Sequence, residues 1–355
     1  MSNRILLLSL LHPLPDNPAR GAFVADRVRL LRSMGHDVKV VNTLPRMLRM
    51  HEQRRSTMQG VAKAPRAFSF EGHEVLTVRH TAFPDNPLPR WTAASIKRQA
   101  RRIEKWLGEW RPELISSHTI WPTAELARVL SERWKIPWVA TVHGHDFDVG
   151  LAANQGKRIR NLCQSADALM VVSERLDGVI DGSRVIPCHL EMPDSARKKM
   201  EKWHGRWRRG ELEILFPANS RRPEKNHILA LNTGRELETR GWRVKIGDLP
   251  NVPRDVVHDR MRACDIALVT SLRESGPVAA REAIACGLPV VSVDVGDLAT
   301  WLPKRCIAKD TPEALADAVE TILEGEVNDL FVPERFEAGV VSKQLEDLFT
   351  RLLPR

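Results

Sequence analysis

The stretch SLRESGPVAAREAIACGLPVVSVDVGD, from Ser271 to Asp297, decides the fold of this chain. An apolar run, Ile266–Val269, precedes it, and a second apolar run, Leu288–Val293, lies near its end. Between the two runs a Ser-Gly-Pro turn leads into a helical segment that stops at Cys286-Gly287. The order strand, turn, helix, strand predicts one βαβ unit whose loop lies at the carboxyl end of the first strand.

Two glutamates flank this turn and helix. Gly276 lets a ligand approach the backbone, and Pro277 is predicted to be the first residue of the helix. The start of a helix offers unpaired N–H groups and a positive dipole end to an anion such as a diphosphate. Glu282, a turn and a half into the helix, suits a vicinal diol such as a ribose, and Glu274 precedes the turn. The alternative is an ordinary buried βαβ unit with two solvated glutamates, and the local sequence alone favours neither.

This stretch resembles the Glu-x7-Glu donor-site motif of the retaining GT-B glycosyltransferases of family four, and Ala283–Leu298 is close to the sequence usual in that family. The resemblance implies an α/β GT-B fold, in which two Rossmann-like, doubly wound domains face a central cleft. It also implies that Glu282 binds the nucleotide ribose and that Glu274 lies at the donor sugar. The residues that line the turn complete the implied donor site: Ser275, Gly276, Pro277 and Val278.

A basic loop follows another predicted strand, where residues 216–226 read FPANSRRPEKN. Cations here can neutralise a diphosphate leaving group, although a solvated basic loop is the alternative. The segment resembles the family's loop in which an arginine and a lysine hold the donor pyrophosphate. Lys225 matches the lysine, whereas Ser220 stands at the usual arginine position, so either Arg221 or Arg222 takes that role.

The segment VHGHDFDV, residues 142–149, places His143 directly after a predicted strand. It resembles the family's His-Gly-x-Asp pattern, which implies that His143 approaches the donor sugar and that no metal is bound. A structural histidine is one alternative, and a metal site that uses His143, His145, Asp146 and Asp148 is another. Near the N-terminus, Gly21 opens a helix and resembles the family's glycine loop, which faces acceptor and donor phosphates.

Strand-like and helix-like segments alternate in both halves of the chain, which predicts parallel α/β sheets. The alternation is lost between Asp181 and Gly210, where we place the domain junction. The predicted domains are 1–190 on the acceptor side, 191–333 for the nucleotide sugar, and 334–355, a helix that by resemblance crosses back to the first domain. The predicted strands are Arg4–Leu10, Asp37–Val41, Glu74–Val78, Glu113–Ser117, Trp138–Val142, Ala168–Val172, Leu212–Phe216, Arg243–Ile246, Asp265–Val269 and Pro289–Val293. The predicted helices include Phe23–Met34, a long basic helix Thr92–Trp110 and Glu334–Leu353, and residues 45–72 form a surface excursion.

Bulk properties favour a two-domain cytoplasmic protein with an anionic partner. The chain has 355 residues, a formal net charge of +9, and five scattered cysteines without a CxxC pair. No apolar run approaches the ~18 residues of a membrane-spanning helix. The positive charge concentrates in 46–66, in the helix from Thr92 and in 197–209, each of which could be a solvated face. We expect peripheral contact with the anionic inner membrane surface through 46–66 and the helix from Thr92.

The sequence therefore predicts a retaining, metal-independent glycosyltransferase that uses a nucleotide-diphosphate sugar as co-substrate and no cofactor. The expected acceptor is lipid-linked, a glycan or another polyanion, in the synthesis of a cell-surface glycan or glycoconjugate. One alternative is a sugar-nucleotide 2-epimerase, which shares the fold. The other is a nucleic-acid-binding protein or base-modifying transferase, and the lack of zinc-finger or RNP-type motifs argues against a stable nucleic-acid complex.

Overall fold

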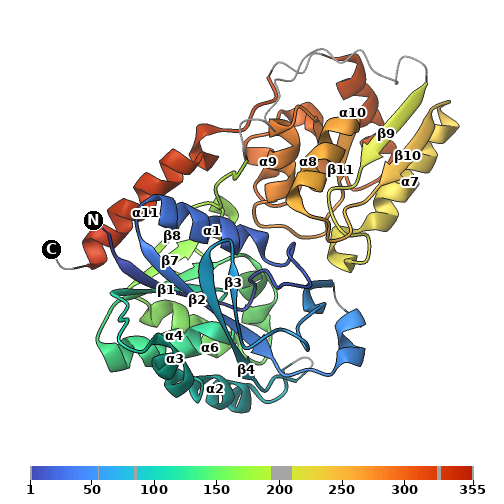
Figure 1. The fold of residues 1–355 in the computed structure, drawn as a ribbon. Coiled ribbons are helices and arrows are strands. Elements are labelled where there is room, and N and C mark those ends of the chain that lie inside the picture. The colour runs from blue at the N-terminus through green and yellow to red at the C-terminus, as the bar shows by residue number, and fades with distance from the viewer. Residues whose placement is uncertain (1, 55, 84–85, 193–209, 326–328, 354–355) are drawn as a thin grey trace. The chain divides into compact units, whose positions relative to one another are not determined.

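The computed structural model (Figure 1) describes residues 2–54, 56–83, 86–192, 210–325 and 329–353. The chain forms two compact units. The first unit comprises Met1–His189 together with Ala338–Arg355, and the second comprises Leu190–Glu337. Each unit is built around its own sheet with helices packed on it, as the alternating sequence pattern predicted.

The first unit holds an eight-stranded sheet in the order β3-β4-β2-β1-β5-β6-β7-β8, in which only the β3–β4 pairing is antiparallel among the described strands. Its strands are β1 (Arg4–Ser9), β2 (Asp37–Pro45), β3 (Ala67–Phe70), β4 (His73–His80), β5 (Leu114–His118), β6 (Trp138–Val142), β7 (Ala168–Val171) and β8 (Ser183–Val185). Its helices are α1 (Ala22–Ser33), α2 (Pro89–Lys97), α3 (Ala100–Leu107), α4 (Thr123–Trp134), α5 (His145–Asp148), α6 (Gly156–Ser165) and α11 (Ala338–Leu352), with short 3-10 turns at Arg49–Arg54, Ser56–Met58, Gly150–Ala152 and Glu174–Leu176.

The core of the first unit lies on both faces of its sheet. Successive residues of β1 alternate between the faces, so that Leu6 and Leu8 join one apolar cluster while Ile5 and Leu7 join the other. The first cluster packs under α2, α3, α4 and α6, and the second packs under α1 and α11. Because both faces are covered, the central strands appear in the sequence as continuous apolar runs rather than as alternating ones.

The second unit holds a five-stranded parallel sheet in the order β10-β9-β11-β12-β13 among its described residues. Its strands are β9 (Glu211–Leu215), β10 (Arg243–Gly247), β11 (Ile266–Val269), β12 (Val290–Val293) and β13 (Ile307–Ala308). Its helices are α7 (His227–Thr239), α8 (Arg254–Ala263), α9 (Val278–Ala285) and α10 (Pro312–Glu324), with 3-10 turns at Pro223–Lys225, Leu298–Thr300, Lys304–Cys306 and Glu334–Phe336.

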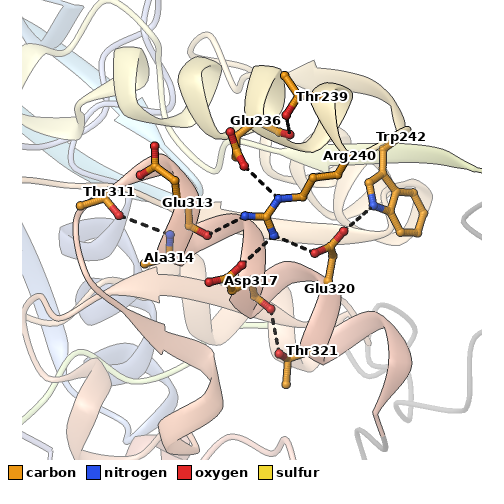
Figure 2. Close-up of polar contacts among 10 residues, drawn as sticks. All are labelled: Glu236, Thr239, Arg240, Trp242, Thr311, Glu313, Ala314, Asp317, Glu320 and Thr321. Atoms are coloured by element: carbon orange, nitrogen blue, oxygen red, sulfur yellow. Dashed lines mark hydrogen bonds and ion pairs between the residues drawn. The ribbon is translucent and has the colours of Figure 1, made fainter.

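One arginine links two helices of the second unit, as Figure 2 shows. The Arg240 guanidinium, just after α7, lies 2.9 Å from the Glu236 carboxylate, 2.6 Å from Asp317 and 2.8 Å from Glu320 on α10. The Trp242 indole N–H donates to Glu320 at 2.9 Å. These charge-assisted bonds raise the pKa of Arg240, and the network holds α7 beside α10 at the surface.

Several predicted boundaries were wrong. The long helix predicted at Thr92–Trp110 is two helices, α2 and α3, because the Gln99 N–H bonds to the Ile96 carbonyl at 2.9 Å in a tighter, 3-10-like turn. The C-terminal helix begins at Ala338 instead of Glu334, after a 3-10 turn. The short strands β3, β8 and β13 were not predicted.

The surface excursion predicted at residues 45–72 contains two 3-10 turns and β3, and its middle is anchored. Val61 is fully buried beside Leu14 and Leu44, and Arg20 donates to the Thr57 carbonyl at 2.8 Å. The basic run 197–209 lies outside the described residues. Within the described residues, no helix has both the length and the apolar character needed to span a bilayer.

Candidate functional site

The strands β9 and β11 are neighbours in the second sheet, and the loops that follow them meet at its carboxyl edge. The Lys225 ammonium, in the 3-10 turn after β9, forms an ion pair with Glu274 Oε1, and each side chain is 14% exposed. The Ser271 hydroxyl donates to the same oxygen at 2.8 Å. The Thr270 hydroxyl donates to the Asn226 carbonyl at 2.9 Å, which ties the two loops together. The structure thus brings a predicted lysine and a predicted carboxylate into direct contact.

The helix after this loop begins one residue later than predicted. Pro277 is the N-cap of α9, with an extended ψ of 99°, and Val278 is the first helical residue. The Pro277 carbonyl accepts the first-turn bond from the Ala280 N–H at 3.1 Å. Since a proline side chain has no acceptor, it cannot cap the first N–H groups of the helix, which suits an anion.

A buried ion pair lies beneath the Ser275–Pro277 turn. Arg281 and Asp297 are 2.6 Å apart and almost fully buried, and the Arg281 guanidinium stacks 3.6 Å from the Phe336 ring centroid. A Cβ at Gly276 would lie 2.6 Å from Arg281 Nη2 and 3.2 Å from Asp297 Oδ2, so a larger residue there would have to displace this ion pair. The ion pair therefore supports the Ser275–Pro277 turn from the protein interior. Sequence reasoning assigned no role to Arg281 or Asp297, although both lie in the decisive stretch.

Gly296 is a second glycine that this turn requires. Its φ is +66°, and a Cβ there would lie 3.0 Å from the Ser275 carbonyl oxygen and 3.1 Å from Glu274 Cβ. The loop after β12 therefore packs directly against the turn after β11. This packing fixes the position of Glu274, together with the hydrogen bonds of its own side chain.

Glu282 is 7% exposed and faces α8. Its Oε1 atom lies 3.0 Å from Arg254 Nη2 and 4.0 Å from His258 Nε2. Burial, with the charges of Arg254 and Arg262 as further causes, lowers the pKa of His258, so this imidazole is neutral at pH 7. Arg254 and His258 were missed by sequence reasoning, although their i,i+4 spacing places them on one helical face.

The two candidate arginines of the basic loop differ in their surroundings. The Arg222 guanidinium lies 2.8 Å from Glu224 Oε1. Arg221 is exposed, and its backbone N–H donates to Asn219 Oδ1 at 2.9 Å. The described part of the chain gives the Arg221 side chain no ion pair, so its guanidinium is the more available of the two.

In the first unit, His143 follows β6 and lies against His118, at the end of β5. His143 Nε2 is 3.0 Å from His118 Nδ1, and the Phe23 ring centroid is 4.5 Å from that of His143. Burial, and then the charge of Arg27, lowers the pKa of His143 to about 3, and the pKa of His118 falls well below its usual value. Both imidazoles are neutral at pH 7. His118 was missed, although β5 and β6 are neighbouring strands.

The acidic residues near His143 have partners within the protein. Asp146 accepts hydrogen bonds from the backbone N–H groups of Ile120 at 2.8 Å and Trp121 at 2.9 Å, while Asp148 lies 2.9 Å from Arg175. Among the residues that the structure describes, no group of three or more His, Cys, Asp or Glu side chains is arranged to hold a metal ion.

Gly21 is the N-cap of α1 and has the left-handed φ of 61°. A Cβ at this position would lie 2.6 Å from the Leu11 carbonyl carbon, so the backbone approach requires glycine. Arg20, next to it, is buried and donates to the His12 carbonyl at 2.7 Å. The loop from His12 to Gly21 is therefore closely folded.

Two family models match the chain. A glycosyl transferase 4-like domain matches residues 21–178, and glycosyl transferases group 1 matches residues 222–325. A putative teichuronic acid biosynthesis glycosyltransferase of Bacillus subtilis is 26% identical over an alignment 382 positions long, which covers 96% of this chain and 97% of that protein. A D-inositol 3-phosphate glycosyltransferase of Acidothermus cellulolyticus is 26% identical over an alignment 347 positions long, which covers 80% of this chain and 72% of that protein.

Solved structures show the same fold at low sequence identity. Sucrose-phosphate synthase from Thermosynechococcus elongatus superposes with a TM-score of 0.66 at 16% identity, over 99% of each chain. A UDP-forming trehalose-phosphate synthase from Burkholderia vietnamiensis gives a TM-score of 0.68 at 14% identity, also over 99% of each chain.

Proposed function

We propose that this chain transfers a sugar from a nucleotide-diphosphate donor to a hydroxyl acceptor with retention of configuration. The proposal starts from the family, because the chain belongs to the group 1 glycosyltransferases and has their GT-B fold. The observation that carries the proposal is the grouping of Lys225, Glu274 and the N-terminus of α9 at one carboxyl edge, with Glu282 inside that helix. The full-length similarity to a teichuronic acid glycosyltransferase supports cell-surface glycan synthesis as its setting.

The proposed reaction assigns roles to two cations, the start of α9, Glu282 and His143. Lys225, Arg221 and the N–H groups at the start of α9 neutralise the diphosphate as the bond between the sugar and the phosphate oxygen breaks. The electron pair of that bond stays on the diphosphate. The acceptor oxygen attacks on the same face of the sugar, and its proton passes to the departing diphosphate. Glu282 accepts hydrogen bonds from the ribose, and neutral His143 contacts the sugar. No cofactor or metal takes part in this proposal.

A thermal-shift panel of UDP, GDP, ADP, CMP and dTDP tests the donor site. A nucleotide at a hundred times its dissociation constant should stabilise the folded protein by about 2.7 kcal/mol. In Glu282→Ala the stabilisation by the same nucleotide should largely disappear, because the carboxylate that accepts the ribose hydroxyls is lost. Glu238→Ala, at an exposed glutamate of α7, should respond as the parent does.

If none of the five nucleotides stabilises the parent, or if Glu282→Ala responds like Glu238→Ala, the proposed donor site is wrong. A nucleotide that does stabilise the parent identifies which nucleotide sugars to test. Incubation of such a sugar without acceptor separates transfer from epimerisation, since only an epimerase converts it into an isomeric nucleotide sugar under those conditions.

We also propose a membrane-associated acceptor, from exposed apolar and basic side chains in the first unit. Trp91 is 69% exposed at the start of α2, and Leu88, just before that helix, is 44% exposed. Arg101 and Arg102 lie exposed on α3. Exposed tryptophan and exposed basic residues both suit the interface of an anionic bilayer, where each basic residue contributes about 1 kcal/mol.

Sedimentation with anionic vesicles tests the membrane proposal. Combining Trp91→Ser with Arg101→Gln and Arg102→Gln should weaken binding by more than about tenfold, because two charges and one aromatic anchor are lost. A matched variant with Arg160→Gln and Arg184→Gln, both exposed in the same unit, removes the same charge elsewhere. Equal weakening by the two variants, or equal parent binding to neutral vesicles, would contradict the assignment.

A further inference from the structure

The last residues of the second unit are connected to the Ser275–Pro277 turn by two sets of contacts. We propose that Arg335 and Phe336, just before α11, are positioning residues that hold this turn in the conformation that binds the donor diphosphate. The inference rests on the proposed function, because it assigns the support of the same donor site to a segment that touches no ligand.

The first set of contacts runs through the buried ring of Phe336. This side chain is 1% exposed, and the guanidinium carbon of Arg281 lies 3.6 Å from its ring centroid. Arg281 Nη2 lies 2.6 Å from Asp297 Oδ2, and a Cβ at Gly276 would meet the same nitrogen at 2.6 Å. A planar guanidinium stacks on an aromatic face, so the ring fixes the plane of the group that packs under the turn.

The second set of contacts runs through the hydroxyl of Thr300. Arg335 Nη2 donates to this oxygen at 2.8 Å, and the hydroxyl donates to the Asp297 carbonyl at 2.7 Å. One hydroxyl can accept and donate at the same time. Asp297 follows Gly296, whose backbone is so close to the turn that a Cβ there would lie 3.0 Å from the Ser275 carbonyl oxygen. The second set therefore reaches the turn through the loop after β12.

Phe336 is itself held by neighbours within the second unit. Its carbonyl accepts a hydrogen bond from the Leu190 N–H at 2.7 Å, and the Trp301 ring meets its ring in an edge-to-face arrangement at 6.0 Å. The second unit begins at Leu190 and ends at Glu337, so the segments by which the chain enters and leaves this unit are bonded to each other. A support that is fixed before the ligand arrives lowers the entropy cost of binding.

The positioning role differs in its consequences from simple packing in the core. A side chain that only fills the core changes the free energy of unfolding. A side chain that positions the turn must also change the binding of the part of the ligand that the turn holds. In the proposed function this part is the diphosphate, which faces the N–H groups at the start of α9. A nucleoside monophosphate lacks the second phosphate, so it depends less on the turn.

The test is the ratio of two dissociation constants, measured for the nucleoside monophosphate and the nucleoside diphosphate of the base that thermal shift identifies. The parent should bind the diphosphate at least about tenfold more tightly, the value of one hydrogen bond to a charged group. Phe336→Leu should reduce this preference to about threefold or less. Thr300→Val should reduce it by about threefold, the size of one neutral hydrogen bond. Neither substitution changes the charge of the protein, so a lost long-range attraction cannot explain the result.

Two matched variants on α10 provide the controls. Ile322, like Phe336, is 1% exposed, and Ile322→Val makes a core side chain of the same unit smaller. The Thr321 hydroxyl donates to the Asp317 carbonyl at 2.7 Å (Figure 2), so Thr321→Val removes the same kind of bond as Thr300→Val. Both controls should keep the parent preference for the diphosphate, whatever they do to the melting temperature.

The outcomes separate this inference from the proposed function. The parent preference in both Phe336→Leu and Thr300→Val would overturn the inference, as would an equal reduction in the two controls. If Phe336→Leu does not fold, Thr300→Val decides alone, because its site is exposed. A parent that binds neither nucleotide, or binds both equally well, would instead contradict the proposed function, since the start of α9 would then hold no diphosphate.

Discussion

Replacing Lys225 with alanine is expected to lower the rate of sugar transfer by about 10²–10³-fold, the range found when one group that stabilises developing charge is removed. The Lys225 side chain is largely buried at the carboxyl edge of the sheet, and its ammonium is paired with Glu274. In the proposed mechanism, its loss removes the cation that neutralises the departing diphosphate and leaves the Glu274 carboxylate to repel that diphosphate. Initial rates with the nucleotide sugar identified by thermal shift would measure the effect, which should fall mainly on kcat.

Lys245→Ala provides the control for this prediction. Lys245 lies on β10 of the same unit, is 79% exposed and pairs with Glu213, so its removal costs the same charge away from the site. It should leave the rate of transfer close to that of the parent. A Lys225→Ala variant that transfers sugar at the parent rate would remove this residue from the proposed mechanism.

Replacing Arg281 with methionine should destabilise the second unit by about 3–5 kcal/mol, because the buried Asp297 carboxylate would lose its counter-ion. At about 2–4 °C per kcal/mol for a unit of this size, the unfolding midpoint should fall by about 10 °C. Thermal unfolding of the full chain, followed by circular dichroism, measures this change. The increase in the unfolding midpoint on nucleotide binding should also become smaller in Arg281→Met, since the ion pair supports the Ser275–Pro277 turn.

Two further variants make the Arg281 prediction specific. Arg243→Met breaks a surface pair with Glu211, at an arginine that is 71% exposed, and should change the midpoint little. Replacing both partners, with Arg281→Met and Asp297→Leu, should recover much of the stability because no charge stays buried alone. If Arg281→Met melts at the parent temperature, the ion pair does not support the Ser275–Pro277 turn.

The fold was largely predictable because its central strands are covered on both faces. Such strands appear as uninterrupted apolar runs, as in β1 and β11, and glycines mark where the helices end. The strands that were missed are short or exposed at a sheet edge: β13 has two residues, and alternate side chains of β3 face solvent. The break between α2 and α3 carries no Gly or Pro, so no local signal marks it.

The candidate site was likewise predictable only where its residues follow apolar runs in the sequence. Lys225 and Glu274 follow apolar runs, so their place at strand ends could be predicted, although they are 49 positions apart. Arg254, His258 and Arg281 could not be predicted, because their importance comes from tertiary contacts that no local pattern encodes. Charged residues on a helix usually face solvent, and only the structure shows that these face inward.

The discontinuity of the first unit has a consequence for how the protein is made. Its apolar cluster under α1 is completed by Leu345 and Phe349 of α11, whereas the second unit is one continuous segment. At about 5–20 residues per second, synthesis of the intervening segment Leu190–Glu337 takes roughly 7–30 s. During that time the nascent first unit keeps one face open to chaperones and to other chains, while the later-synthesised unit can already close.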